Sequence, residues 1–348
     1  MKNIVIGIDI SKKTTDWCLV DGTKVVSYHN VENKIGTIEA KLRELMKSMP
    51  MEPCNLMVCA EHTGHYTYPL TIACHNLGID LWLESGYNIK CEARKERGKS
   101  DKEDSRRIAE YGYKNQCDAR FHVLPSKELS LLDSLLSERD SYVTEKAKLE
   151  GQLHDQKDFT DPDAYKAKAK RLKKLIGQYA KSISEVEAEM EKVMKSDDTM
   201  RHQSELLQTI PGVGRQTAMA MIVATDCFTL FENGRQFCCY AGTAPFTYNS
   251  GTSIRSKSRV SHRANKSMKS LLHLCAVSLL RTKKQANQFV EYYRRKIEEG
   301  KNAMSVLNAI RSKLILTMFA IIRTDEPYSM EVVHNYVEKY SGKSIVKP

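Results

Sequence analysis

Four carboxylates in the first third of the chain have types and spacing that suit a divalent cation. Asp9 lies within a strand-like run, and Glu61 ends a second apolar run. Asp101 and Asp104 stand three residues apart, which puts them on one face of a helix. Carboxylates, waters and substrate phosphates are the ligands that Mg²⁺ prefers. Together the four acids predict a magnesium site for phosphoryl transfer.

Each acid taken alone also has an ordinary structural explanation. Asp9 is compatible with an exposed position on an edge strand, and Glu61 with a solvated carboxylate where a strand ends. The Asp101 and Asp104 pair is compatible with an acidic first turn, which the helix dipole favours. It is the combination of the four acids that indicates a cation site.

The elements expected to position Asp9 and Glu61 form a mixed sheet. Alternating isoleucines at 4–10 predict a strand that carries Asp9 on the face opposite to them. An Asp-Gly turn at 21–22 then predicts a hairpin of two further strands. Helix and strand alternate over about 36–85, so we expect an α/β sheet in the order of ribonuclease-H-like folds.

The helix that carries the other two acids has a clear start signal. Ser100 and Glu103 have the spacing of a capping box, in which each residue satisfies a free backbone N–H group of the other. The pair predicts that a helix begins at Asp101.

The middle of the chain is expected to form a coiled coil. A heptad seam runs through Leu172, Ile176, Tyr179, Ile183, Val186, Met190 and Val193. The preceding helical stretch has a broken heptad, and DFTDPDAY at 158–165 separates the two helices. They can therefore fold back as an antiparallel hairpin or extend to a partner chain. The sequence is therefore compatible with two functions of this segment, a structural spacer and a dimerisation segment.

The last third contains a candidate phosphate-binding turn. Pro-Gly-Val-Gly at 211–214 joins two short helices, as in a helix-hairpin-helix element. Such a turn directs backbone N–H groups and a helix N-terminus outward, which suits a phosphate. Gly212, Gly214 and Arg215 are therefore candidate nucleic-acid contacts, and a tight turn without a ligand is the alternative.

The charge of the chain points to a polyanionic partner. The net charge is +11, and a basic surface is typical of nucleic-acid-binding proteins. One short stretch is dense enough in cations to contact several phosphates, the alternative being a solvated surface: Arg255, Lys257, Arg259, His262, Arg263, Lys266 and Lys269.

Other classes of protein are disfavoured. The longest apolar run, at 314–322, has about half of the ~20 residues needed to cross a bilayer, and the N-terminus does not have the pattern of a signal peptide. The ten cysteines form no CxxC pair and no zinc-finger spacing. We expect a cytoplasmic protein without a membrane partner.

Three segments resemble a known family. They read GIDISK around Asp9, AEHTGHY around Glu61 and KSDKEDS around the helix pair. These segments are similar to the Asp, Glu, Asp, Asp motif of RuvC-like DEDD transposases, insertion-sequence recombinases related to the Piv pilin-gene invertase. The segments LLQTIPGVGRQTA and YNSGTS are similar to the transposase domain of that family. Ser105 stands where the family commonly has alanine.

The resemblance implies a fold and a mechanism. It implies an α/β ribonuclease-H-like (RuvC-like) domain at 1–122, a coiled-coil segment at 123–203, and a mainly α transposase domain with the helix-hairpin-helix element at 204–348. The four acids would hold Mg²⁺ at the scissile phosphate, and Ser250 would be the nucleophile that forms a covalent phosphoserine. Without the family, Ser250 is an ordinary turn residue.

The resemblance also implies partners. These are donor and target DNA, a noncoding bridge RNA that selects them, and further copies of the chain in dimers and tetramers. Two other functions fit the residues: a metal-dependent junction-resolving nuclease that activates water, and a basic architectural DNA-binding protein.

Overall fold

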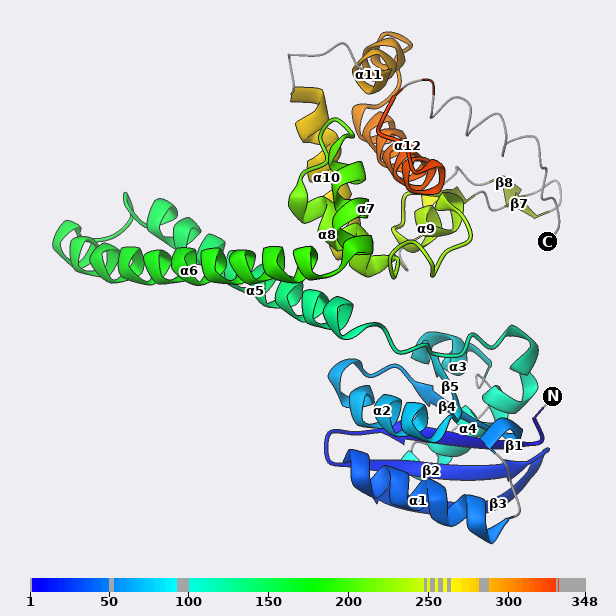
Figure 1. The fold of residues 1–348 in the computed structure, drawn as a ribbon. Coiled ribbons are helices and arrows are strands. Elements are labelled where there is room, and N and C mark those ends of the chain that lie inside the picture. The colour runs from blue at the N-terminus through cyan, green and yellow to red at the C-terminus, as the bar shows by residue number, and fades with distance from the viewer. Residues whose placement is uncertain are drawn as a thin grey trace. The chain divides into compact units, whose positions relative to one another are not determined.

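The computed structural model describes residues 2–49, 53–92, 100–246, 249–250, 254–255, 259–261, 264–281, 288–329 and 331. The chain divides after Leu124 into two compact units, Met1–Leu124 and Pro125–Pro348. The middle helices and the C-terminal helices belong to the second unit (Figure 1).

A five-stranded mixed sheet forms the first unit, with the strand order β3-β2-β1-β4-β5. The three strands of the N-terminal meander are antiparallel, whereas β4 runs parallel to β1 and β5 runs parallel to β4. Gly22 adopts a φ of 60° in the turn between β2 and β3, so the predicted Asp-Gly hairpin is confirmed. The strands are β1 (Ile4–Ile10), β2 (Thr14–Asp21), β3 (Lys24–Glu32), β4 (Leu56–Glu61) and β5 (Asp80–Glu84).

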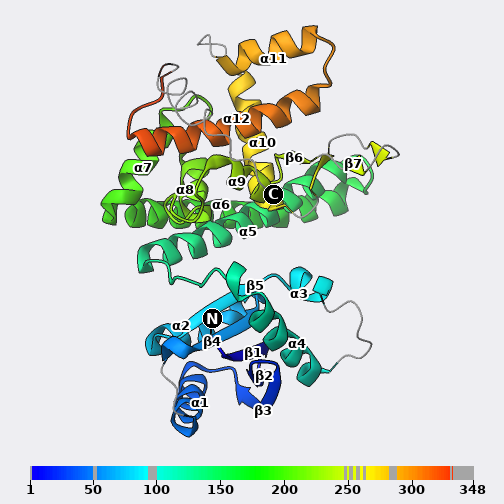
Figure 2. The ribbon, with the colours of Figure 1, turned by 90° about the vertical axis from the view of Figure 1, so that its right-hand side faces the viewer.

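Helices cover both faces of this sheet (Figure 2). The isoleucine face of β1 packs in one core with α1 (Ile35–Ser48) and α2 (Tyr68–Leu77). The face that carries Val5 packs in a second core with α3 (Gly86–Glu92) and α4 (Asp101–Lys114). Strand alternation puts Asp9 on the face that α4 covers.

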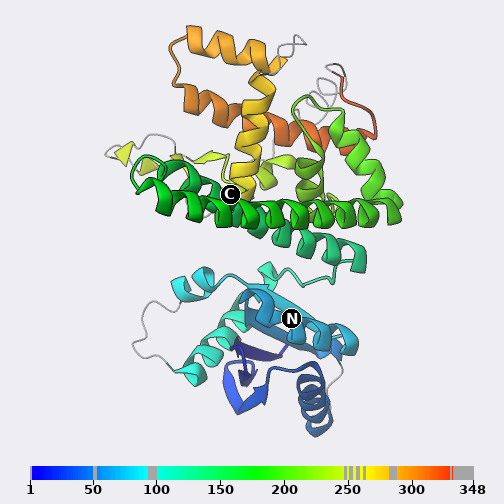
Figure 3. The same ribbon diagram turned by 90° about the vertical axis from the view of Figure 1, so that its left-hand side faces the viewer.

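Two long helices open the second unit, α5 (Lys127–Asp155) and α6 (Pro162–Ser196), and they pack against each other as an antiparallel hairpin (Figure 3). Near the tip, the Tyr165 hydroxyl donates to the carbonyl oxygen of Leu153 at 2.6 Å. Further along, the rings of Tyr142 and Tyr179 lie 6.0 Å apart. The predicted seam of α6 therefore faces α5 of the same chain.

Six shorter helices complete the second unit within the described ranges: α7 (Asp198–Gln208), α8 (Arg215–Ala224), α9 (Gly234–Tyr240), α10 (Lys266–Arg281), α11 (Gln288–Glu298) and α12 (Ala303–Thr324). The inner end of the hairpin joins their core, in which Leu132 and Met190 are fully buried. Of the described helices, α12 alone is long and apolar enough to cross a membrane, but most of it is buried in this core.

Candidate active site

The carboxyl ends of two neighbouring parallel strands bring Asp9 and Glu61 together. In the ladder between β1 and β4, Ile8 pairs with Ala60. The next residue of each strand is an acid, and alternation puts both acids on the α4 face. The half-buried Asp9 also pairs with Asp16 of β2 in the antiparallel ladder.

The helix that carries the other two acids is fixed at its start and packs closely on β1. Ser100 caps α4, since its Oγ accepts a hydrogen bond from the Glu103 amide at 3.2 Å, which confirms the predicted helix start. A Cβ atom on Gly7 would lie 2.3 Å from the carbonyl oxygen of Ser105, closer than side chains tolerate. The small residues at these positions let α4 approach the strand.

Electrostatics show that the acids converge on Asp9. Burial and, after it, the charges of Asp104, Asp101, Glu61 and Asp16 raise the pKa of Asp9 to about 6. A carboxylate beside several others holds its proton more tightly, because adding another negative charge there is unfavourable. Perturbed carboxyls of this kind are typical of functional sites.

The four acids differ in their present partners. Glu61 lies 3.8 Å from the Lys90 ammonium, and Asp104 lies 3.0 Å from the Arg107 guanidinium. Asp9 and Asp101 form no side-chain hydrogen bond or ion pair with any described residue. Among the described residues, no group of three or more Asp, Glu, His or Cys side chains is close enough together to hold a metal ion as it stands. The donor set of oxygen ligands nevertheless fits a hard divalent cation, which would relieve the repulsion around Asp9.

Two further acids of this region were missed by the sequence-based prediction. Asp16 is the cross-strand partner of Asp9, and Glu84 pairs with Glu61 in the ladder between β4 and β5. Glu84 accepts hydrogen bonds from Asn88 Nδ2 at 3.1 Å and from the Tyr111 hydroxyl at 3.3 Å. A strand-end acid after an apolar run, the signal that identified Glu61, was also present at Glu84.

Ser250 lies in the second unit, in a short two-stranded ladder. It ends β7 (Asn249–Ser250) and pairs with Ile254 of β8 (Ile254–Arg255). Outside the described residues lie Thr252, Ser253, Lys257, His262 and Arg263.

The segment that contains Ser250 is held together at its base. Asn265 binds Tyr240 twice, since its amide donates to the carbonyl oxygen at 2.9 Å and its Nδ2 to the hydroxyl at 2.7 Å. Gly242, with a φ of 66°, packs so closely on Ala264 that an added Cβ atom would lie 2.1 Å from the alanine Cβ. The strands β6 (Pro245–Phe246) and β9 (Arg259–Val260) then pair. We call residues 241–264 the serine loop.

Among the predicted nucleic-acid contacts, three described side chains remain available. Arg259 in β9 and Lys266 in the first turn of α10 are exposed, and Lys269 is half-buried. None of the three side chains forms an ion pair or hydrogen bond with a described residue. Arg259 lies within the serine loop, and Lys266 and Lys269 lie in the first turn of the helix that follows it. Of Arg255, only the backbone position in β8 is described.

The Pro-Gly-Val-Gly turn has a different environment. Gly212 adopts a φ of 81° and packs on α10, where an added Cβ atom would lie 2.7 Å from Leu279 Cβ. Space around Gly214, the N-cap of α8, is open. Arg215, however, forms an ion pair with Glu191 of α6 at 2.6 Å. The turn therefore lies beside acids of the hairpin.

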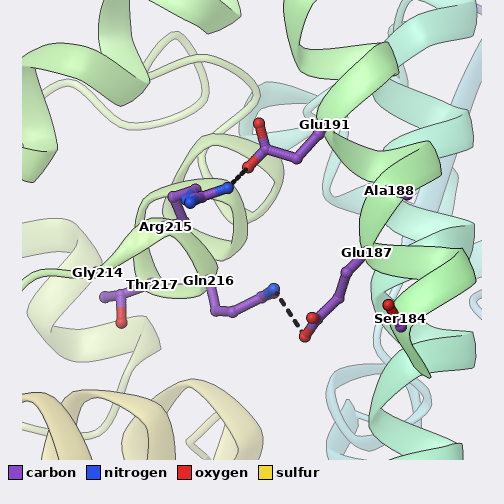
Figure 4. A pocket seen from close by; sticks show the side chains of 8 residues that line it. All are labelled: Ser184, Glu187, Ala188, Glu191, Gly214, Arg215, Gln216 and Thr217. Atoms are coloured by element: carbon purple, nitrogen blue, oxygen red, sulfur yellow. Dashed lines mark hydrogen bonds and ion pairs between the residues drawn. The ribbon is translucent and has the colours of Figure 1, made fainter. Parts of the chain in front are cut away.

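Glu187 and Glu191 line a pocket of about 520 Å³. Figure 4 shows both side chains, with Arg215 and Gln216 directed towards them. Gln216 Nε2 donates to Glu187 Oε1 at 3.2 Å, and Arg139 of α5 also binds Glu187, at 2.6 Å. Arg215, which the sequence analysis assigned to a phosphate, therefore already has an acidic partner, Glu191 of α6.

Two family models match this chain. Residues 6–162 match the transposase model of the DEDD IS110 type, and residues 204–292 match the model described as Transposase IS116/IS110/IS902 family. The chain belongs to the IS110-type DEDD transposases. Members of this family are enzymes that act on DNA, so the predicted enzyme class is confirmed.

Known relatives agree with this assignment. The transposase is 25% identical over 338 residues to the pilin gene-inverting protein of Moraxella bovis, covering 95% of this chain and 99% of the relative. The Moraxella lacunata protein of the same name is 24% identical over the same shares. An uncharacterised 43.6 kDa protein of insertion element IS110 from Streptomyces coelicolor is 30% identical over 34% of this chain and 29% of its own.

A solved structure is similar to part of the transposase. T. thermophilus RuvC in complex with a Holliday junction substrate is 16% identical and covers 34% of this chain and 99% of its own. Its TM-score is 0.27, too low to support further comparison.

Proposed function

We propose that this transposase cuts and rejoins the DNA strands of an insertion sequence by serine attack at a Mg²⁺-assisted site. Convergence of Glu61, Asp101 and Asp104 on Asp9, in a chain of this family, supports the proposal most directly. Asp9, Glu61, Asp101 and Asp104 are the residues that would hold the cation. When bound, the cation stabilises charge on the attacking and leaving oxygens.

The chemical step is a transesterification at phosphorus. Ser250 Oγ forms a bond to the scissile phosphorus, and the bond to the leaving sugar oxygen breaks with its electron pair going to that oxygen. The serine proton passes to the leaving oxygen, directly or through water, so that the sugar leaves as a hydroxyl. A covalent phosphoserine keeps the energy of the phosphodiester, so a sugar hydroxyl can later reverse the step and rejoin the strands. A serine hydroxyl is a poor nucleophile unless it is activated.

DNA is a polyanion, so cationic side chains are expected to supply much of its binding. Arg259, Lys266 and Lys269 form no ion pair or hydrogen bond with a described residue, and we propose that they contact phosphates. Arg255, Lys257 and Arg263 of the same stretch are proposed to do the same. Gly212, Gly214 and Arg215 remain candidate contacts, under the condition that Arg215 leaves Glu191.

The family resemblance supports several finer proposals. We assign the first unit to the ribonuclease-H-like fold, because it has an antiparallel meander followed by parallel strands. The helices around the Pro-Gly-Val-Gly turn are proposed as a helix-hairpin-helix element. A noncoding bridge RNA is proposed to select donor and target DNA. The enzyme is proposed to act in the cytoplasm as a dimer or tetramer.

Trapping on labelled DNA tests the nucleophile. Ser250→Ala should bind DNA as the wild type does but give neither strand exchange nor a protein–DNA adduct, because productive attack needs the reacting atoms about 3–3.5 Å apart and in line. Thr252→Ala and Ser253→Ala are the matched controls and should keep at least part of both activities.

The position of the adduct decides between the functions. Peptide mapping that finds the nucleotide on Thr252 or Ser253 would refute the assignment to Ser250. Strand cleavage by Ser250→Ala would indicate a nuclease that activates water. Bound but intact DNA with the wild-type protein would indicate an architectural DNA-binding protein.

A further inference from the structure

The charges of α6 are separated by sign along the helix. The outer part, 164–184, contains seven lysine or arginine residues and no acid, whereas the following turns, 185–191, contain four glutamates and no cation. A solvent-exposed helix usually mixes the two signs, because opposite charges one turn apart stabilise it and like charges destabilise it. The outer part of α6 therefore contains a repulsion that a structural spacer does not require.

Most of these cations lie on one face of the helix. Five lysines recur at intervals of three, four and seven residues, which keeps them on one side of a helix, and all five are exposed: Lys166, Lys170, Lys173, Lys174 and Lys181. At a rise of 1.5 Å per residue, the row is about 22 Å long. We call these five lysines the basic stripe.

The basic stripe faces away from α5. The side of α6 that contacts α5 carries the buried Leu172, together with Tyr165 and Tyr179, which contact Leu153 and Tyr142 of α5. Helical periodicity puts this side roughly opposite to the stripe. The outer end of the hairpin also extends beyond the shorter helices of the second unit (Figure 1). No described element of the second unit therefore covers the stripe.

Acids of the hairpin leave most of the stripe without a counter-charge. Lys181 has an acidic neighbour, Glu185, at 3.8 Å. The other four lysines form no ion pair or hydrogen bond with a described residue. On the facing helix, Glu145 and Glu150 pair with lysines of α5 itself, at 2.6 Å and 3.5 Å. The stripe therefore carries an uncompensated positive charge.

A second copy of the chain fits the stripe poorly. Of the inner acids of α6, Glu187 lies 2.6 Å from Arg139 and Glu191 lies 2.6 Å from Arg215, so both are already paired within the chain. Two stripes from different copies would repel each other. A polyanion is the partner that matches the charge of the stripe, and enzymes of this family act on DNA.

We propose that the basic stripe binds the phosphate backbone of the substrate DNA duplex, an inference that rests on the proposed function. Lysine ammonium groups bind phosphates as point charges and do not read bases, so this contact is independent of DNA sequence. Binding releases counterions condensed on the DNA and relieves the repulsion among the lysines. The stripe thus adds affinity without adding sequence specificity.

Paired substitutions of equal charge test the stripe. Lys170→Gln combined with Lys174→Gln removes two of its charges and keeps the helix propensity, because glutamine and lysine are similar helix formers. The slope of log affinity against log salt concentration should fall by about two, and equally for two duplexes of unrelated sequence. Lys146→Gln combined with Lys148→Gln is the control, since these lysines of the same hairpin already have acidic partners. The control should change the slope by less than half as much.

Two further measurements separate binding from folding. Lys170→Arg combined with Lys174→Arg keeps both charges and should keep the wild-type slope. The glutamine variant should melt at or above the wild-type temperature, because a repulsion is removed. A lower melting temperature would overturn the proposal, since it would show that the two lysines make stabilising contacts within the fold.

Other outcomes would also overturn the proposal. An unchanged slope with DNA is one of them, and a slope that falls only when double-stranded RNA is the probe is another. A lower mass of the glutamine variant by light scattering, with an unchanged DNA slope, would show that the stripe packs on a second copy. Wild-type protein that binds DNA but forms neither cleaved product nor adduct contradicts the proposed function, and the slope comparison still decides the role of the stripe.

Discussion

Gly7 of β1 lies so close to α4 that a Cβ atom at this position would stand 2.1 Å from the amide nitrogen of Ala109. A second close approach follows along the helix, where a Cβ on Gly112 would lie 2.8 Å from the Cβ of Cys59. The contact between Gly7 and α4 fixes how near the helix pair of acids comes to Asp9.

Gly7→Ala should therefore damage both the fold and the site. The added methyl group meets backbone atoms that cannot rotate away, so we expect a loss of about 1–3 kcal/mol or more in the free energy of unfolding, together with loss of DNA cleavage. Gly36→Ala in α1 is the control, because nothing lies within 4 Å of its added Cβ. It should stabilise the helix by roughly 0.5–1 kcal/mol and preserve activity. Urea denaturation that finds Gly7→Ala as stable as the wild type would contradict this account.

Gly86→Ala should disturb one catalytic candidate while keeping every charge. A Cβ at Gly86 would lie 1.8 Å from Glu61 Oε1, so the carboxylate must move. Because a carboxylate is the flexible end of a side chain, we expect stability within about 1 kcal/mol of the wild type. Cleavage should fall at least tenfold and require more Mg²⁺, which a metal titration of cleavage rates measures. If Gly86→Ala needs no more Mg²⁺ than the wild type, Glu61 is not a ligand of the metal.

Much of the first unit could be predicted from sequence because its signals are local. Alternating isoleucines, an Asp-Gly turn and the Ser100 cap each specify an element within a few residues. Asp16 and Glu84 were missed because their proximity to the site depends on the register between strands, which no single segment specifies.

The contacts between elements of the second unit could not be predicted from the sequence, because they join residues that lie far apart in the chain. A heptad seam predicts that a helix packs against another helix but not which one, so only the structure identifies α5 as the partner of α6. Likewise, the basic Pro-Gly-Val-Gly-Arg sequence gives no sign of Glu191, which comes from the preceding hairpin.

The ion pair between Arg215 and Glu191 predicts unequal effects of two cation deletions on DNA binding. Lys266 is exposed and unpaired among described residues, so Lys266→Met should lower affinity and reduce the salt slope by about one. Arg215→Met should have less than half of that effect on the slope, because Glu191 already neutralises its charge. Glu191→Gln should increase affinity. Equal slopes for the two cation deletions would show that DNA displaces Glu191.

The two ends of the hairpin should differ in their contribution to stability. Met190 is fully buried where α6 joins the helical core, so Met190→Ala should cost about 2–5 kcal/mol. Ile176 is half-buried, so Ile176→Ala should cost less than about 1.5 kcal/mol. Chemical denaturation measures both. A larger cost at Ile176, together with a lower mass by light scattering, would show that the outer seam packs on a second copy.

Asp9 makes the stability of the transposase depend on pH in an unusual direction. Its folded-state pKa is about 6, whereas an unfolded aspartate has a value near 3.8, so the folded protein holds the proton more tightly. The Asp9 contribution to stability is therefore present below about pH 4 and is lost as the pH rises to about 6 and above. At pH 7, Asp9→Asn should be more stable than the metal-free wild type by roughly 1–3 kcal/mol, the lower value allowing for solvent screening.

The same variant should abolish cleavage while leaving most DNA affinity, because lysine and arginine contacts to phosphate supply that affinity. Mg²⁺ should raise the melting temperature of the wild type at pH 7 and so reduce the advantage of Asp9→Asn, since a cation offsets the repulsion from Asp104, Asp101 and Glu61. Asp158→Asn, which removes an exposed carboxylate from the segment between α5 and α6, should change neither stability nor its pH dependence. Melting curves from pH 3.5 to 8 test this directly: a stability difference that persists at pH 3.5 would indicate a packing effect of asparagine, and wild-type cleavage in excess chelator would exclude a metal role for Asp9.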